Sequence, residues 1–348
     1  MRNPFAINFG MIPNERIERK ILIDEIVSEF TSDTMQNPCY MITGVRGTGK
    51  TVTLTEIEKE ISKEDKWIII RLNSSRDILS SLVGKLYDSH EFICNFIDAN
   101  INLSKFGIGV SLSSKSPVSD IESALEIILK EIKRQKYRLL VTIDEVSNTP
   151  SMREFASTYQ IMIREELPFY LIMAGLYKNI HDLENEDNLT FLYRTPKLEM
   201  KPLNITRIRD RYSKIFNIAS DKAMEMALIT KGYAFAYQAL GKYLWESKNH
   251  ELSDTVLYYF DEALSHYVYE KIWSELSAMD RKYMQYIVTK EEIDVSEVLK
   301  LASCKPNVFS QYRKRLSEKG LIDTSQHGKI KFTLPRFDVF VQNQLLLS

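Results

Sequence analysis

Residues 44–51 read GVRGTGKT, which fits the spacing G-x-x-x-x-G-K-[ST]. The stretch follows a short apolar run at 39–43 and opens a segment of helical periodicity from about 50 to 62. Glycines at these positions let backbone N–H groups converge on phosphate, where the N-terminus of the following helix adds partial positive charge. The stretch therefore predicts a phosphate-binding loop between a strand and a helix.

The side chains of this loop predict a site for ATP with Mg²⁺. Lys50 is expected to neutralise charge on the β- and γ-phosphates, and the Thr51 hydroxyl to ligate the metal. The alternative is a glycine-rich turn with an incidental lysine. The residues expected to hold the nucleotide are Gly44, Val45, Arg46, Gly47, Thr48, Gly49, Lys50, Thr51 and Val52.

A pair of carboxylates follows another apolar run about ninety residues further on. Residues 139–145 read LLVTIDE, so Asp144 and Glu145 stand at the end of an expected buried strand. Asp144 is expected to bind Mg²⁺, directly or through water, and Glu145 to orient and deprotonate the attacking water. The alternative is that the two carboxylates cap the next helix.

Strands alternate with helices up to about residue 202, which predicts an α/β layer with parallel strands. The expected strands are 39–43, 67–72, 139–143 and 169–173, and the expected helices include 76–100, 119–135 and 151–166. The dense β-branched residues of 67–72 predict burial on both faces. Alternation over 101–112 predicts a hairpin, which is either plain edge structure or a contact surface.

Two further patterns follow, and they set the expected domains. Residues 204–278 show helical periodicity only, and the last 70 residues predict three short helices and a hairpin that turns at 325–328. The predicted domains are a core at 1–202, a helical lid at 203–275 and a winged helix at 276–348.

Composition excludes several classes of protein. The 348 residues include 46 Lys+Arg and 47 Asp+Glu, with 44% hydrophobic residues, so wholesale disorder is excluded. No apolar run approaches the roughly 20 residues that span a bilayer, and no membrane partner is expected. The N-terminus lacks a signal-peptide pattern, and three separated cysteines fit no metal spacing. These features predict a cytoplasmic protein.

The chain has a glycine-rich motif, an acidic motif, a helical region and then a helix–hairpin module. In this order of features it resembles the AAA+ ATPases of the initiator (origin-recognition) clade. The chain is closer still to prokaryotic P-loop ATPases known as archaeal-type ATP-binding proteins. The resemblance implies a P-loop NTPase core with a parallel sheet of about five strands, a helical lid and a winged helix. The resemblance also implies that an N-terminal segment, residues 1–30, lies against the adenine.

Family resemblance also assigns individual residues. It implies adenine-side contacts from Pro4, Phe5 and Arg19, although residues 3–13 have the alternative of a loose terminus. Arg194 would be an arginine finger for a neighbouring subunit, or else a surface ion-pair partner. Residues 169–177 lack the polar sensor at the strand tip, and Phe235 or its neighbours stand where initiators place the second sensor arginine. ATP hydrolysis is therefore expected to be slow or partner-stimulated.

The C-terminal module carries a local excess of positive charge. Residues 300–336 contain nine Lys and Arg against two Asp and Glu, the pattern expected of phosphate binding. In this interpretation Met279 and Val308 face inward, and Arg313, Lys314 and Arg315 are surface positions. The residues expected to contact double-stranded DNA are Lys305, Asn307, Ser310, Gln311, Arg313, Lys314, Arg315, Lys329 and Lys331.

Two functions remain open at this point. The first is a switch in which ATP binding and slow hydrolysis are coupled to binding of double-stranded DNA through the winged helix. The second is a signalling or scaffold ATPase whose winged helix contacts a protein partner or another copy of the chain. The excess of basic residues favours the first function, and the missing sensor residues leave the second function open.

Overall fold

The structure is a computed structural model that describes residues 3–8, 13–32, 34, 36–101 and 120–346. The chain divides into two compact units. One, here called the sheet unit, comprises residues 19–43 and 50–199. The other, here called the helical unit, comprises residues 1–18, 44–49 and 200–348. Within the described ranges, no helix combines the length and apolarity needed to cross a membrane.

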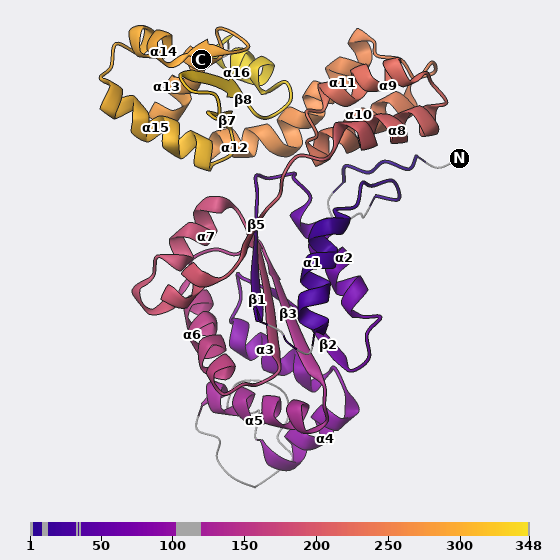
Figure 1. The fold of residues 1–348 in the computed structure, drawn as a ribbon, viewed down its shortest axis with the longest axis vertical. Helices are drawn as coiled ribbons and strands as arrows, with labels where there is room; N and C mark the ends of the chain where they lie inside the picture. Colours follow the sequence, from indigo (N-terminus) through magenta and orange to yellow (C-terminus); the bar gives the residue numbers. More distant parts are fainter. Residues whose placement is uncertain (1–2, 9–12, 33, 35, 102–119, 347–348) are drawn as a thin grey trace. The chain divides into compact units, whose positions relative to one another are not determined.

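The sheet unit is built on five parallel strands in the order β2-β3-β4-β1-β5. This confirms the expected α/β layer and places β1, which leads into the glycine-rich loop, inside the sheet (Figure 1). The strands are β1 (Cys39–Thr43), β2 (Trp67–Asn73), β3 (Arg138–Asp144), β4 (Phe169–Gly175) and β5 (Lys197–Glu199). The helices are α1 (Lys20–Thr31), α2 (Lys50–Ile61), α3 (Ile78–Tyr87), α4 (Glu91–Asn100), α5 (Ile121–Arg134), α6 (Pro150–Arg164), α7 (Tyr177–Glu184) and the 3₁₀ helix η2 (Asp187–Arg194).

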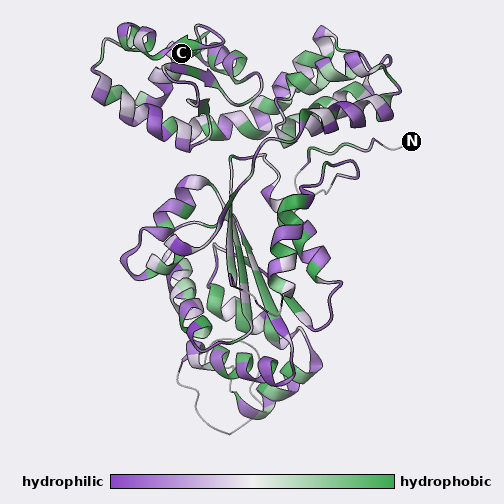
Figure 2. Cartoon of the chain, in the orientation of Figure 1, coloured by the Kyte–Doolittle hydropathy of each residue, from purple (hydrophilic) through white to green (hydrophobic). Residues whose placement is uncertain are grey.

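Apolar residues cover both faces of this sheet. On one face, alternate strand residues such as Met41 and Val141 join a core with α3, α5, α6 and α7. On the other face Phe30 of α1 packs edge-on against Tyr40 and Tyr170. Figure 2 shows the resulting concentration of hydrophobic residues along the strands. Burial of both faces is typical of parallel sheets and holds β1 rigidly.

The sheet unit departs from the sequence expectations at two places, and a third expectation lies outside the described residues. The prediction that 67–72 is buried on both faces is wrong, because β2 is an edge strand and Arg71 is exposed. The expected helix over 76–100 is two helices, α3 and α4, which are separated by residues 88–90. The expected hairpin lies almost entirely at 102–119, outside the described residues.

The helical unit begins with four helices, in agreement with the helical periodicity of 204–278. They are α8 (Ile205–Phe216), α9 (Ser220–Ile229), α10 (Ala234–Glu246) and α11 (Asp254–Leu264). A short π-helix, η3 (Ser265–Tyr269), then leads into α12 (Glu270–Ser274).

A C-terminal module of helices and short strands follows within the same unit. Its helices are α13 (Ala278–Ile287), α14 (Val295–Ala302), α15 (Pro306–Glu318) and α16 (Phe337–Leu346). Its strands are β6 (Ile293–Asp294), β7 (Ile322–Asp323) and β8 (Lys329–Phe332), which form an antiparallel sheet in the order β6-β8-β7. The three helices and the hairpin match the sequence expectation, whereas β6 and α16 were not predicted.

One continuous apolar core runs through the helical unit. It includes Tyr212 and Phe260 of the four-helix part together with Tyr283 and Phe337 of the C-terminal module. Tyr269 of the π-helix packs edge-on against Phe337, and its hydroxyl donates to the Pro335 carbonyl at 2.5 Å. The joint between the two parts is therefore buried and hydrogen-bonded.

Candidate nucleotide and nucleic-acid sites

The glycine-rich loop has the backbone that its sequence predicts. Gly47 and Gly49 have φ of +75° and +90°, values that glycine adopts without steric cost. The Thr48 hydroxyl donates to the Val45 carbonyl at 2.8 Å and closes a turn inside the loop. α2 then begins at Lys50, so the loop runs directly into a helix N-terminus, as an anion site requires.

The sheet unit brings Thr51 and Asp144 together across ninety-three residues of sequence. The Thr51 hydroxyl, in the first turn of α2, donates to Asp144 Oδ2 at 2.5 Å at the end of β3. These two hard oxygen donors fit Mg²⁺, which takes few protein ligands and keeps water and phosphate oxygens as the rest. Among the described residues there is no group of three or more His, Cys, Asp and Glu side chains that could hold a metal ion.

Glu145 has an unusual backbone conformation for a non-glycine residue. Its φ is +53°, its N–H donates to Asp144 Oδ1 at 2.8 Å, and its carbonyl accepts the Ser74 hydroxyl at 2.9 Å. Such conformations cluster at functional sites. The helix-cap alternative fails, because Thr149 is the N-cap of α6 and its side chain accepts the Met152 N–H.

The sensor positions depart from the family pattern as the sequence indicates. β4 is buried along its whole length and ends in Met173, Ala174 and Gly175, without a polar side chain. Arg194 ends η2 just before β5, is exposed, and makes no ion pair with any described residue. The alternative of a surface ion-pair partner is therefore wrong within the described residues.

The N-terminal residues are ordered by contacts inside the helical unit. Phe5 is buried, stacks on Phe216 at 5.9 Å between ring centroids and meets Tyr212 edge-on. The Ala6 N–H donates to Gln238 Oε1, and Gln238 Nε2 donates to the Glu15 carbonyl. The loose-terminus alternative therefore does not hold for these residues. Phe5 serves the core of this unit, which leaves its ring no open face for an adenine.

The other two adenine-side expectations differ in environment. Pro4 is partly buried, and its carbonyl accepts the Glu15 N–H at 3.1 Å. Arg19 belongs to the sheet unit. Burial lowers the pKa of Arg19, and the Glu56 carboxylate partly offsets that shift.

Most of the basic residues at 300–336 are already paired with carboxylates. Lys329 lies 3.4 Å from both Glu292 and Asp294, and these contacts raise its pKa. The other paired cations are Lys314 with Glu318, Arg315 and Lys319 with Asp280, Lys331 with Asp323, and Arg336 with Asp261. Only Lys300, Lys305 and Arg313 have no such partner among the described residues. The local excess is therefore largely neutralised by acidic residues that precede the segment.

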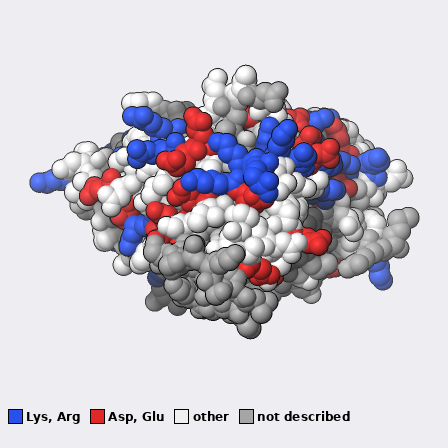
Figure 3. Space-filling view, turned by 90° about the horizontal axis from the view of Figure 1, so that it is seen from below, with Lys and Arg blue, Asp and Glu red and all other residues white. Residues whose placement is uncertain are grey.

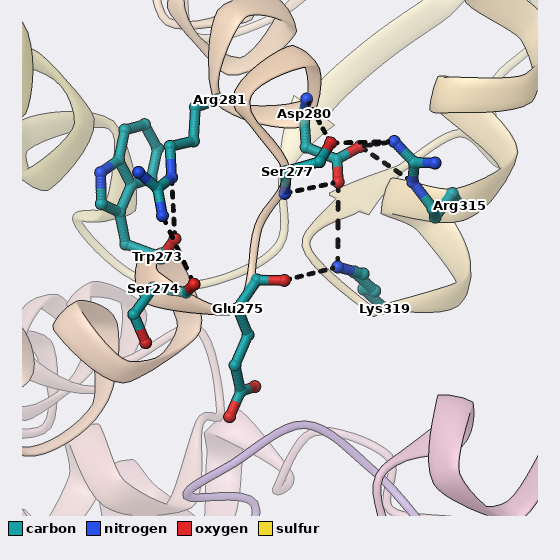
Figure 4. Close-up of polar contacts among 8 residues, drawn as sticks. All are labelled: Trp273, Ser274, Glu275, Ser277, Asp280, Arg281, Arg315 and Lys319. Carbon is teal, nitrogen blue, oxygen red and sulfur yellow. Dashed lines mark hydrogen bonds and ion pairs between the residues drawn. The ribbon is translucent and has the colours of Figure 1, made fainter.

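Asp280 is the centre of this pairing (Figure 4). Its side chain is 2% exposed and accepts two bonds from Arg315, with Lys319 Nζ 3.9 Å away. It also accepts the Ser277 N–H, while the Ser277 hydroxyl accepts the Asp280 N–H, which completes a capping box at α13. Arg315 is exposed as expected, but its guanidinium stabilises the fold of the module.

The inward face of α15 differs from the expected one by one residue. Phe309 and Leu316 are buried, whereas Val308 is 40% exposed. Met279 of α13 is likewise 40% exposed, so the expectation that Met279 and Val308 face inward is wrong. Lys305, Asn307, Ser310 and Gln311 are exposed, in agreement with the sequence.

Opposite charges are also mixed elsewhere on the molecule. Figure 3 shows one face on which Lys and Arg side chains lie among Asp and Glu side chains. The nearly equal totals of basic and acidic residues agree with this mixture.

The comparisons with known proteins cover both the C-terminal module and the whole chain. A family described as a domain of unknown function (DUF8462) matches residues 266–341. No curated protein sequence matches the chain. The Walker-type ATPase PABY2304 of Pyrococcus abyssi is similar in structure, with a TM-score of 0.61, 14% identity, and 94% of this chain and 98% of that chain covered. The ORC2 protein of Aeropyrum pernix, in its ADPNP–ADP complexes, has a TM-score of 0.59, 15% identity, and 98% of each chain covered.

These matches extend over nearly the whole length of each chain. The chain therefore has the fold of the AAA+ P-loop ATPases of the initiator clade, as the sequence motifs predict.

The Asp280 contacts predict different costs for two arginines on the same helix. We expect Arg315→Ala to lower the free energy of unfolding by about 1–2 kcal/mol, less than for a fully buried pair because Lys319 still faces Asp280. Arg313→Ala, which breaks no described ion pair, should stay within about 0.5 kcal/mol. Thermal unfolding of the two variants checks this, and equal midpoints would contradict the role given to Arg315.

Proposed function

We propose that this protein is an ATPase that uses binding and slow hydrolysis of Mg²⁺-ATP as a conformational switch. The observation that supports it best is the Thr51–Asp144 contact, because it joins the end of the glycine-rich loop to the carboxylate motif. ADP would be the product of hydrolysis. In this proposal Lys50 binds the β- and γ-phosphates, and the N–H groups of residues 44–49 cradle the phosphate chain.

The metal ion, the attacking water and the transition-state charge would be handled by other side chains. Thr51 and Asp144 would hold Mg²⁺, which when bound neutralises charge that develops on the phosphates. Glu145 would accept a proton from the attacking water, and its backbone is held by hydrogen bonds with Asp144 and Ser74. Exposed Arg194 would supply its guanidinium to the site of another copy of the chain. Without the sensor residues, turnover would depend on that second copy or on another partner.

We further propose that the switch acts on double-stranded DNA through the C-terminal module, as a winged helix. Lys305, Asn307, Ser310, Gln311 and Arg313 would then face the DNA from α15. The alternative is a protein partner. It is favoured by the ion pairing of most basic residues in the module and by its exposed apolar side chains, Met279, Leu301 and Val308.

Lys50 decides the nucleotide site. We expect Lys50→Ala to weaken binding of Mg²⁺-ATP by about 10- to 150-fold, because a charge-assisted bond to phosphate is lost. Lys59→Ala is a matched control, since Lys59 is an exposed lysine later on the same helix. Isothermal titration of the two variants checks the assignment. Equal affinities would show that the loop does not hold the nucleotide.

Glu145 decides the chemistry. Glu145→Gln should keep nucleotide affinity, because the Thr51 and Asp144 oxygens remain, and should lower the hydrolysis rate by about 100-fold or more through loss of the base. Phosphate release under single-turnover conditions is the measurement. Hydrolysis at the unsubstituted rate would mean that another group orients the water.

The unpaired cations separate the DNA proposal from the partner proposal. Neutralising Lys305 and Arg313 together should flatten the slope of log affinity for duplex DNA against log salt by about 2 units. The control neutralises Lys314 and Lys329, which face carboxylates, and should change the slope less. An unaltered slope in the first variant, or no DNA binding by the unsubstituted protein, would favour the protein partner.

A further inference from the structure

Two backbone carbonyls of the glycine-rich loop accept hydrogen bonds from residues at the start of α10, and both segments belong to the helical unit. The Tyr233 hydroxyl donates to the Arg46 carbonyl, and the Phe235 N–H donates to the Gly47 carbonyl at 2.9 Å. Gly47 lies so close that a Cβ on it would overlap the Tyr233 hydroxyl and lie 3.0 Å from Phe235 Cβ. The start of α10 therefore fixes the carbonyl groups of two consecutive loop residues, Arg46 and Gly47.

Fixing a carbonyl also fixes the N–H on the other side of the same peptide group. The peptide is planar and trans, so its C=O and N–H point in opposite directions. A bond to the Arg46 carbonyl thus orients the Gly47 N–H, and a bond to the Gly47 carbonyl orients the Thr48 N–H. Because the Thr48 N–H also makes a long 3.4 Å bond to Val45 inside the loop, the Arg46–Gly47 peptide is the clearer case.

Tyr233 is suited to hold that peptide. Its side chain is buried, and burial raises the pKa of its hydroxyl well above the ordinary value, so it remains a donor at neutral pH. A second contact reaches the same loop residue, since the Arg46 guanidinium lies 3.1 Å from Glu275. That pair is about one-third exposed on each side, and such pairs contribute little. The hydrogen bond from the buried tyrosine is therefore the stronger restraint.

We propose that Tyr233 is a positioning residue for nucleotide, because it holds the Arg46–Gly47 peptide with its N–H directed to the phosphate chain. The inference rests on the proposed nucleotide binding. It also specifies which nucleotides are affected. The loop N–H groups cradle the phosphates that ADP and ATP share, so loss of the hydroxyl weakens both equally. A residue that touched the γ-phosphate would affect ATP alone.

The test compares Tyr233→Phe with Tyr212→Phe in the full chain. Tyr212 is a matched control, because it is also buried and its hydroxyl donates to a backbone carbonyl, that of Tyr237, at 2.7 Å. Equilibrium binding of Mg²⁺-ATP and Mg²⁺-ADP is measured for both variants, with thermal unfolding as the check on folding. We expect Tyr233→Phe to bind both nucleotides about 3- to 10-fold more weakly. Tyr212→Phe should bind both as the unsubstituted protein does.

Three outcomes overturn the inference. The first is unchanged affinity of folded Tyr233→Phe for both nucleotides. The second is a loss confined to ATP, which would make Tyr233 a γ-phosphate contact. The third is an equal loss in Tyr212→Phe, which would show a general effect of stability. Binding by the unsubstituted protein is measured first. If it binds neither nucleotide, the proposed function fails as well.

Discussion

A loop that directs its N–H groups to an anion has to place the carbonyl groups of the same peptides somewhere else. In the proposed nucleotide site this constraint would apply to residues 44–49, where Gly47 and Gly49 have positive φ. Two of the outward carbonyls accept hydrogen bonds from Tyr233 and Phe235. The loop also needs fixed ends. They are provided by β1, which is paired on both sides in the sheet, and by α2, which starts at Lys50.

The parts of the site that the sequence predicts are those whose signal is local. GVRGTGKT and the apolar run before Asp144 are each read within a dozen residues, and the structure gives both the expected setting of strand, loop and helix. Ser74 and Thr149 carry no such signal. Their importance depends on the conformation of Glu145 and on the start of α6, neither of which can be read from composition or periodicity.

Non-local pairing explains where the sequence misleads. A count over 300–336 finds few acidic residues, yet Asp261, Asp280, Glu292 and Asp294, from earlier segments of the chain, pair with those cations. Strand β2 is a similar case. Its apolar density resembles that of a central strand, but its place at the edge of the sheet depends on the pairing of all five strands. In both cases the missing information is which distant segments become neighbours.

The turn that precedes α10 is a local feature of the sequence that positions Tyr233 for its contact with Arg46, which is distant in the sequence. Lys231 and Gly232 have φ of +48° and +72°, and the Thr230 hydroxyl donates to the Ala227 carbonyl while accepting the Gly232 N–H. A Cβ at Gly232 would lie 2.5 Å from the Leu203 carbonyl, so this position requires glycine. The family pattern places a phosphate-sensing arginine just after this turn. Here the turn instead brings a buried tyrosine to the glycine-rich loop. In the proposed nucleotide site, the start of α10 would therefore act on the backbone of the loop, which holds the phosphates that ADP and ATP share, and not on the last phosphate.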